Sequence, residues 1–167
     1  MTLEQLNTLD KIQLAAELIK CCGSLSWVKQ MCDRFPVNTK EDLFENAEKI
    51  WMNCSKEDQL EAFTHHPKIG DIDSLKKKFA STAKWAAGEQ SGASTANEEI
   101  LLALSKGNKL YEDKFGFIFI VCATGKSAEE MLGMLQSRLA NNPEEEIQIA
   151  ADEQNKITKL RIEKLLN

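Results

Sequence analysis

The chain has 167 residues, 26 of them acidic and 21 basic, so its formal net charge is 21 − 26 = −5. This length corresponds to one domain, because two domains would each be small and poorly stabilised. Hydrophobic residues make up 43%, and the chain has only 3 prolines and 8 glycines, a composition that excludes a disordered or collagen-like protein. A net acidic chain is also a poor non-specific partner for nucleic acid or anionic lipid.

The sequence shows no pattern for membrane insertion or export. It has no window of about 18 uncharged apolar residues, and its first residues lack the basic and apolar stretches of a signal peptide. The five cysteines are odd in number and form no C-x-x-C pair, so we expect them to be reduced and mostly buried. These features predict a cytoplasmic protein, while a redox or metal site at the adjacent Cys21 and Cys22 stays open as an alternative.

Helical periodicity dominates the first part of the chain. Leu14, Leu18 and Cys21 recur at helical spacing, and Gly23 follows at the position of a helix C-cap. A second helix is predicted over 24–35, where the next residue is proline.

Two capping boxes then predict two further helices. Thr39 with Asp42 and Ser55 with Asp58 have the spacing at which a hydroxyl and a carboxylate satisfy the first backbone N–H groups of a helix. The second of these helices should end near His65, because the following histidine precedes a proline and is excluded from the helical region.

The second half of the chain predicts helices with one extended interruption. Helices are expected over 79–90, from Asn97 to Gly116, from Ser127 to Leu139 with a capping box, and from Pro143 onward. The run 117–123 is the single β-like segment and cannot build a sheet alone. We therefore predict an all-α fold: one compact domain over 1–167, with about eight helices and one short extended segment.

The two adjacent histidines, His65 and His66, are the clearest candidates for chemistry. Imidazole titrates between about pH 5 and 8 and is the natural proton carrier, and the proline after His66 restricts the backbone there. The same position at a helix C-terminus also suits a histidine that only complements the helix dipole. A metal site is disfavoured, because consecutive side chains diverge and the chain has no other histidine.

Two other segments carry weaker signals. Glu89 and Gln90 lie between glycines, where a ligand can approach the backbone closely, although a plain helix surface fits the same residues. Arg161 lies one position away from an expected apolar stripe of Ile157, Leu160 and Leu165; it could grip a carboxylate with two parallel bonds or extend along the surface into solvent. The lysines at 76–78 are most simply a solvated face.

Five short blocks follow one another along the chain: His66-Pro67-Lys68-Ile69-Gly70, Gly88-Glu89-Gln90-Ser91-Gly92, Asn108 with Tyr111 to Gly116, Phe119 to Ala123, and Leu160-Arg161. Together they resemble the signature blocks of the 2-oxo-4-hydroxy-4-carboxy-5-ureidoimidazoline (OHCU) decarboxylase family. The resemblance runs from about residue 10 to the C-terminus, in the order and near the spacing of that family.

The resemblance implies an all-α homodimer that uses no cofactor and no metal. As a carboxy-lyase of purine degradation, it would act after urate oxidation, remove CO₂ from OHCU and give (S)-allantoin. The implied catalytic residues are His66 and Glu89, the second of which holds the ureido group or tunes the histidine. The implied substrate-binding residues are Pro67, Ala86, Ala87, Gly88, Gln90, Phe119, Ile120, Val121, Cys122, Ala123 and Arg161.

The chain departs from the family pattern at two positions. Ala86 stands where the family often has a serine, and His65 stands where a small residue is usual before the histidine–proline pair. Two alternatives therefore accompany the resemblance: a related decarboxylase acting on a different ureide, and a helical interaction module whose apolar run 117–123 binds a partner.

Overall fold

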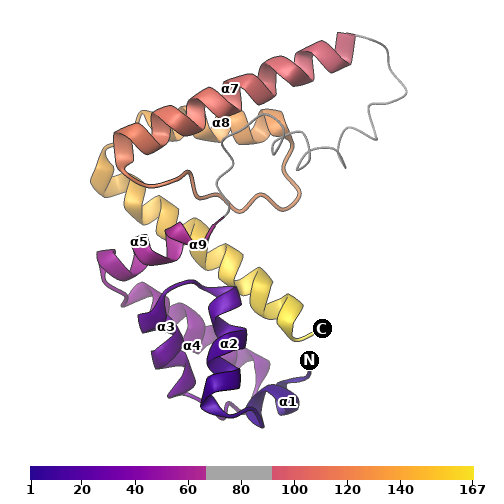
Figure 1. Ribbon diagram of the computed structural model, residues 1–167, viewed down its shortest axis with the longest axis vertical. Helices are drawn as coiled ribbons and strands as arrows, with labels where there is room; N and C mark the ends of the chain where they lie inside the picture. The colour runs from indigo at the N-terminus through magenta and orange to yellow at the C-terminus, as the bar shows by residue number, and fades with distance from the viewer. Residues whose placement is uncertain (67–91) are drawn as a thin grey trace. The chain divides into compact units, whose positions relative to one another are not determined.

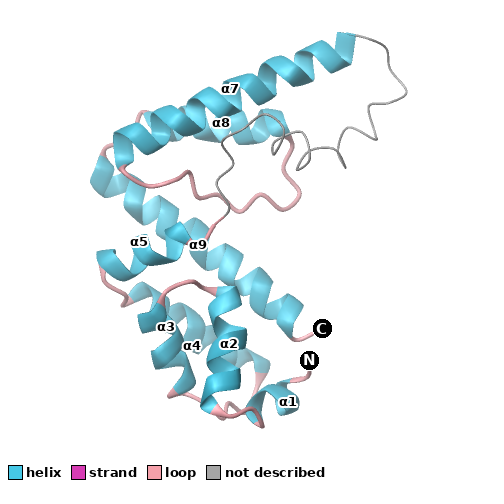
Figure 2. Cartoon of the chain, viewed as in Figure 1, coloured by secondary structure: helices cyan, strands magenta, loops and turns pink. Residues whose placement is uncertain are grey.

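The computed structural model describes residues 1–66 and 92–167, and every regular element in these two ranges is a helix (Figures 1 and 2). The all-α prediction is thereby confirmed, whereas the helix predicted over 79–90 lies outside the described residues. The helices are α1 (Leu3–Asn7), α2 (Lys11–Cys21), α3 (Leu25–Cys32), α4 (Lys40–Met52), α5 (Lys56–Thr64), α7 (Gly92–Phe115), α8 (Ala128–Leu139) and α9 (Pro143–Leu165).

Helix starts follow from local side-chain chemistry. The predicted capping boxes at Thr39, Ser55 and Ser127 are confirmed: each hydroxyl accepts a hydrogen bond from the backbone N–H three residues on, and the acidic side chain there accepts one in return. Thr2 and Asp10 begin α1 and α2 with the same device, with glutamine as the third residue in each helix. Helix α1 was not predicted.

Two predicted helix boundaries are wrong. Helix α3 ends at Cys32 and not at residue 35, because its last turn tightens: the backbone N–H of Arg34 donates to the carbonyl of Met31 at 2.9 Å. Helix α7 begins at Gly92, five residues before the predicted start at Asn97.

Gly23 is not a helix C-cap. The cap of α2 is Cys22, whose backbone is extended, and Gly23 has no positive φ. A Cβ atom at position 23 would lie 2.4 Å from Cγ of His65. The glycine is therefore needed for the close approach of the segment that follows α5, and the sequence pattern alone could not separate these two uses of a glycine.

The chain forms two compact units, and the first comprises Met1–His66, Ile120–Cys122 and Ile149–Asn167. Within it, the purple helices α2, α3 and α4 lie together in Figure 1. Two fully buried tryptophans anchor its core, with the indole N–H of Trp27 donating to the carbonyl of Ala47 at 3.0 Å and that of Trp51 to the carbonyl of Ala151 at 2.8 Å. The second bond ties α4 to α9.

The described part of the second unit comprises residues 92–119 and 123–148. Helices α7 and α8 lie side by side in it, with Leu104, Tyr111 and Leu135 fully buried (Figure 1). A Cβ atom at Gly107 would lie 2.6 Å from Cδ2 of Leu135, so the absence of a side chain there lets the two helices approach. The prediction of one domain over 1–167 stays a prediction.

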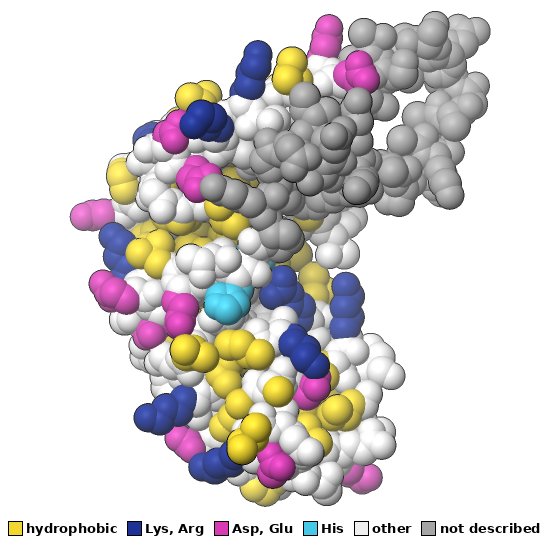
Figure 3. Space-filling view, in the orientation of Figure 1, with side chains coloured by type: hydrophobic (Ala, Val, Ile, Leu, Met, Phe, Trp, Pro, Cys, Tyr) yellow, Lys and Arg dark blue, Asp and Glu magenta, His cyan; other side chains and the backbone are white. Residues whose placement is uncertain are grey.

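The segment 117–123 is drawn as a loop and forms no strand, as expected for a lone β-like run (Figure 2). It begins after Gly116, whose φ of +79° is that of the residue following a helix end. Among the described helices, none is long and apolar enough to cross a bilayer. On the face shown in Figure 3, side chains of both charges are interspersed.

Candidate active site

His66 lies two residues beyond the end of α5. The capping box at Ser55 sets the start of that helix, its last turn ends at His65, and the backbone N–H of His66 still donates to the carbonyl of Phe63 at 3.3 Å. The half-buried imidazole therefore has a defined place. Its Nε2 atom is hydrogen-bonded to Oε1 of Gln154 on α9.

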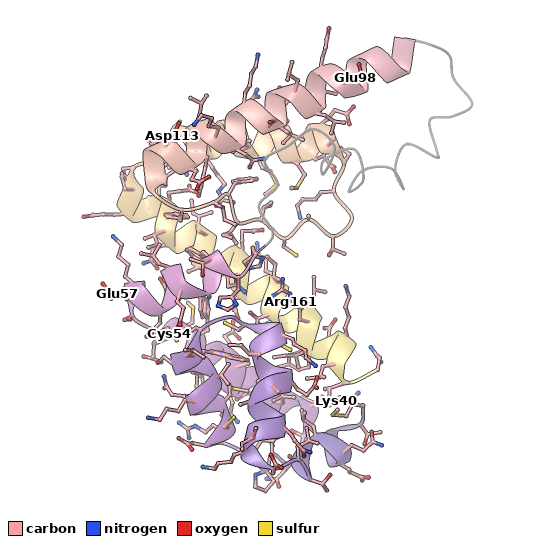
Figure 4. All side chains as sticks on the ribbon, in the orientation of Figure 1. Lys40, Cys54, Glu57, Glu98, Asp113 and Arg161 are labelled. Atoms are coloured by element: carbon pink, nitrogen blue, oxygen red, sulfur yellow. The ribbon has the colours of Figure 1, made fainter. Side chains whose placement is uncertain are left out.

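Arg161 lies on α9, two turns beyond Gln154, and its guanidinium has two sets of contacts. Nη1 donates to the carbonyl oxygens of Lys20 and Cys21 at 3.3 and 3.5 Å, and Nη2 lies 3.5 Å from Nδ1 of His66. The two carbonyls end α2 and have no partners within that helix, so they hold the cation in place. Figure 4 labels Arg161 on α9. The side chain is thus positioned by the protein and not simply extended into solvent.

The predicted apolar stripe of α9 is wrong. Ile157, Leu160 and Leu165 are only half-buried, and the buried face follows a different set of positions. Gln154 and Thr158 precede Arg161 by seven and three residues, which places all three on one side of the helix. The buried residues of α9 are Glu146, Ile147, Ala150, Ala151, Glu153, Gln154, Thr158 and Ile162.

Gln154 and Thr158 are site residues that sequence reasoning missed. Gln154 is fully buried, and its Nε2 donates to Oγ1 of Thr158 at 3.1 Å. The Thr158 side chain also lowers the pKa of the neighbouring Cys22 thiol, against the larger effect of burial, which raises it. The signal that could have found them is the spacing of polar residues on the face that also carries Ala150 and Ala151.

The thiols beside this site are neutral and unreactive. Burial raises the pKa of Cys21 to about 11 and that of Cys22 to about 12. All five cysteines are free, and four are buried. No cluster of three or more potential metal ligands occurs in the ranges that the structure describes. A redox or metal centre at Cys21 and Cys22 therefore finds no support, because thiolates are the reactive and metal-binding form.

Three residues of the predicted lining segment belong to the same unit as His66 and Arg161: Ile120, Val121 and Cys122, all buried. The backbone N–H of Cys122 donates to Oε2 of Glu153 at 2.6 Å, and Lys156 holds the other carboxylate oxygen at 2.5 Å. A side chain of α9 thus supplies the partner that a strand would otherwise give.

The remaining predicted residues divide into two groups. Phe119 and Ala123 belong to the second unit, where the Phe119 ring lies 4.6 Å from the guanidinium carbon of Arg138. The other group, Pro67, Ala86, Ala87, Gly88, Glu89 and Gln90, lies outside the described residues. The structure therefore brings His66 and Arg161 together, with Gln154 as an unexpected third member.

This combination has definite chemical capabilities. An imidazole exchanges protons near neutral pH, and a guanidinium binds a carboxylate with two parallel hydrogen bonds. Nη2 of Arg161 and Nδ1 of His66 are 3.5 Å apart, so one small anionic molecule can contact both side chains. The arrangement fits proton transfer on a substrate that carries an acid group.

A family model described as OHCU decarboxylase matches residues 7–163. The chain is 43% identical to the uric acid degradation bifunctional protein TTL of Arabidopsis thaliana, over 88% of this chain and 45% of that protein. It is 29% identical to the uric acid degradation bifunctional protein of a Bacillus species, over 99% of this chain and 32% of that protein. It thus spans less than half the length of these two relatives.

Matches of similar length also exist. The 2-oxo-4-hydroxy-4-carboxy-5-ureidoimidazoline decarboxylase of Haloferax volcanii is 24% identical over 97% of this chain and 94% of that protein. A crystal structure of OHCU decarboxylase in the presence of (S)-allantoin matches with a TM-score of 0.70 and 41% identity, over 90% of this chain and 96% of the other. An (S)-allantoin synthase structure, 19% identical over 97% of this chain and 53% of its own, has a TM-score of 0.68 and shares the fold.

Proposed function

The chain belongs to the OHCU decarboxylase family, and on that premise we propose that it removes CO₂ from 2-oxo-4-hydroxy-4-carboxy-5-ureidoimidazoline and gives (S)-allantoin. The observation that carries the proposal is the contact between His66 and Arg161, two residues 95 positions apart in sequence whose side chains meet at 3.5 Å. A proton carrier and a carboxylate-binding group are what such a reaction requires.

The electrons released by decarboxylation have an acceptor within the substrate. When the bond to CO₂ breaks, its electron pair forms a double bond to the neighbouring ureido-bearing carbon, and the ring C=N pair moves onto nitrogen, which takes a proton. The hydroxyl then loses its proton to become a carbonyl, and the ureido-bearing carbon takes a proton on one face. Since the ring C=N is the electron sink, the chemistry can proceed without a pyridoxal or thiamine cofactor.

Arg161 binds the polar edge of the substrate in this scheme. Its guanidinium is held by the end of α2, so binding does not have to order a mobile side chain. We assign Ile120, Val121 and Cys122, whose segment is tied to α9 through Glu153, to substrate binding on the family resemblance. Phe119 and Ala123 are assigned to substrate binding on the same resemblance.

His66 exchanges protons with the hydroxyl or with the carbon that becomes chiral. Glu89 and Gln90 hold the ureido group or tune the imidazole, and Pro67, Ala86, Ala87 and Gly88 contact the substrate. These assignments rest on the resemblance of the sequence blocks, and the position of His66 beside Arg161 supports the first of them. Directed protonation on one face would yield a single enantiomer.

The biological setting follows from the same family membership. We propose that the protein acts as a homodimer in the urate branch of purine degradation, without metal or cofactor, and that it binds neither nucleic acid nor membrane. The five free cysteines support a reducing, cytoplasmic location.

The test is to oxidise urate enzymatically in the presence of the protein and to follow the optical activity of the allantoin by circular dichroism. With the wild-type chain, (S)-allantoin should accumulate faster than the spontaneous racemate forms. His66→Asn should slow this by about 10²–10⁴-fold while the fold is retained, because a general acid–base group of this kind contributes that factor.

The matched control is His65→Ala, which removes the neighbouring exposed imidazole. It should keep most of the activity. Racemic allantoin with the wild-type protein would reject the proposed activity and favour an interaction module. Full activity of His66→Asn would reject only the role of that residue.

A further inference from the structure

Gln154 is a fully buried side chain that contacts the imidazole of His66. Its amide joins two partners, accepting at Oε1 and donating at Nε2, and these two ends are not interchangeable. Oε1 faces Nε2 of His66, and Nε2 of the amide donates to Oγ1 of Thr158 at 3.1 Å.

Thr158 is the second partner of this amide. Nε2 of Gln154 donates to the Thr158 hydroxyl oxygen at 3.1 Å, so the NH₂ group of the amide faces Thr158 and its carbonyl oxygen faces the histidine.

A carbonyl oxygen cannot donate, so the ring nitrogen that faces it carries a proton. The other ring nitrogen, Nδ1, faces Nη2 of Arg161 at 3.5 Å, and a guanidinium has only donors. Nδ1 can therefore accept from the guanidinium only when it carries a lone pair, because an N–H group there would face another donor. The contacts with Gln154 and Arg161 thus select the same neutral form of the ring.

We propose that Gln154 is a positioning residue that holds His66 in the tautomer protonated at Nε2, so that the lone pair of Nδ1 is the one presented to the substrate beside Arg161. The first half of this statement concerns the ring alone. The second half rests on the proposed function, because it assigns the nitrogen that exchanges a proton during decarboxylation.

Nitrogen-15 spectroscopy of the imidazole rings tests the first half directly. The chain has only two histidines, so a His65→Gln variant leaves a single ring to observe. In long-range proton–nitrogen correlation spectra at a pH where the ring is neutral, Nε2 should show the shift of a protonated nitrogen and Nδ1 that of an unprotonated one. The reverse pattern would overturn the proposal.

Two substitutions at position 154 separate hydrogen bonding from packing. Gln154→Met keeps the length of the side chain but removes the acceptor, so the ring should become a mixture of tautomers. Gln154→Glu keeps an acceptor and should retain the proton on Nε2. Gln148→Met is the matched control, because Gln148 is an exposed glutamine of the same helix.

The kinetic expectation is a split between kcat and KM. Gln154→Met should lower kcat by about tenfold or more with little change in KM, since the wrong tautomer disables a general base without removing binding groups. Unchanged nitrogen shifts in Gln154→Met would overturn the proposal, and if that variant does not fold, the wild-type and Gln154→Glu spectra decide. A ring protonated at Nε2 in a protein without decarboxylase activity would refute the proposed function and leave the positioning role intact.

Discussion

The two compact units each contain a buried polar network, and the two networks differ in kind. In the second unit, the carboxylate of Glu146 is fully buried and is bonded by Arg138 at 2.5 and 2.6 Å, by Asn141 at 2.9 Å and by the hydroxyl of Tyr111. The Arg138 guanidinium also lies over the Phe119 ring at 4.6 Å. This network is charged, and its carboxylate is bonded from several sides.

The network of the first unit contains no buried ion pair. It runs from Thr158 through Gln154 to His66, and it ends at two half-buried side chains, the imidazole and the guanidinium of Arg161. Buried charge therefore marks the network of the second unit and not the one that holds His66 and Arg161, the residues we propose for the reaction. The pKa of Tyr111 is strongly raised, mainly by burial and by its bond to Glu146, and we propose a structural role for this network.

The largest effect should come from breaking the charged network. Arg138→Met leaves the Glu146 carboxylate buried without its cation, and removing one partner of a buried pair costs about 3–5 kcal/mol. We expect a loss of this size in the free energy of unfolding, measured by urea denaturation.

The control is Lys109→Met in the same unit. The ion pair of Lys109 with Asp113 is exposed on both sides, so its loss should cost less than about 1 kcal/mol. If Arg138→Met costs no more than this control, the network of Glu146 is not the structural element that the contacts indicate.

Arg161→Lys should have an intermediate effect, and it should lower activity while leaving stability nearly unchanged. Lysine keeps the charge but loses the planar pair of donors, so one charge-assisted hydrogen bond worth about 1.5–3 kcal/mol disappears from the bound complex. We expect kcat/KM for OHCU to fall by roughly 10- to 150-fold, while the free energy of unfolding changes by less than about 1 kcal/mol. Unchanged kinetics would show that Arg161 only caps the end of α2.

Helix starts are the part of the fold that the sequence predicted well. They were predictable wherever a capping box, formed by two side chains three residues apart, sets the first turn, as at Thr39, Ser55 and Ser127. Such boxes act within one turn and need no tertiary information. The box at Thr2 has the same form, and α1 was missed although its signal is present.

Long-range partners could not be predicted from spacing. Arg161 contacts backbone carbonyls 140 and 141 positions earlier in the chain, and any carbonyl in the protein could have served. An apolar stripe of α9 was predicted at Ile157, Leu160 and Leu165, because hydrophobic residues usually mark the buried face, but these three side chains are only half-buried. Here two polar residues, Gln154 and Thr158, occupy that face because their hydrogen bonds are satisfied there.

The smallest expected effect is a change in how the free energy of unfolding depends on pH when Cys22 is replaced. Burial raises the pKa of Cys22 from an ordinary 9.0 to about 12, so the folded state keeps a proton that the unfolded chain releases. The resulting stability is complete below pH 9 and is lost as the pH rises towards 12. The raised pKa of Tyr111 acts in the same direction from its ordinary value of 10.0 upward, so the first unit should respond at lower pH.

In urea titrations across this alkaline range, Cys22→Ala should give a flatter dependence of unfolding free energy on pH than the wild type. The wild-type slope should not vanish entirely, because burial also raises the pKa of Cys21 and Cys54 to about 11. Equal slopes for variant and wild type would mean that the Cys22 thiol is not sealed from water in the folded protein.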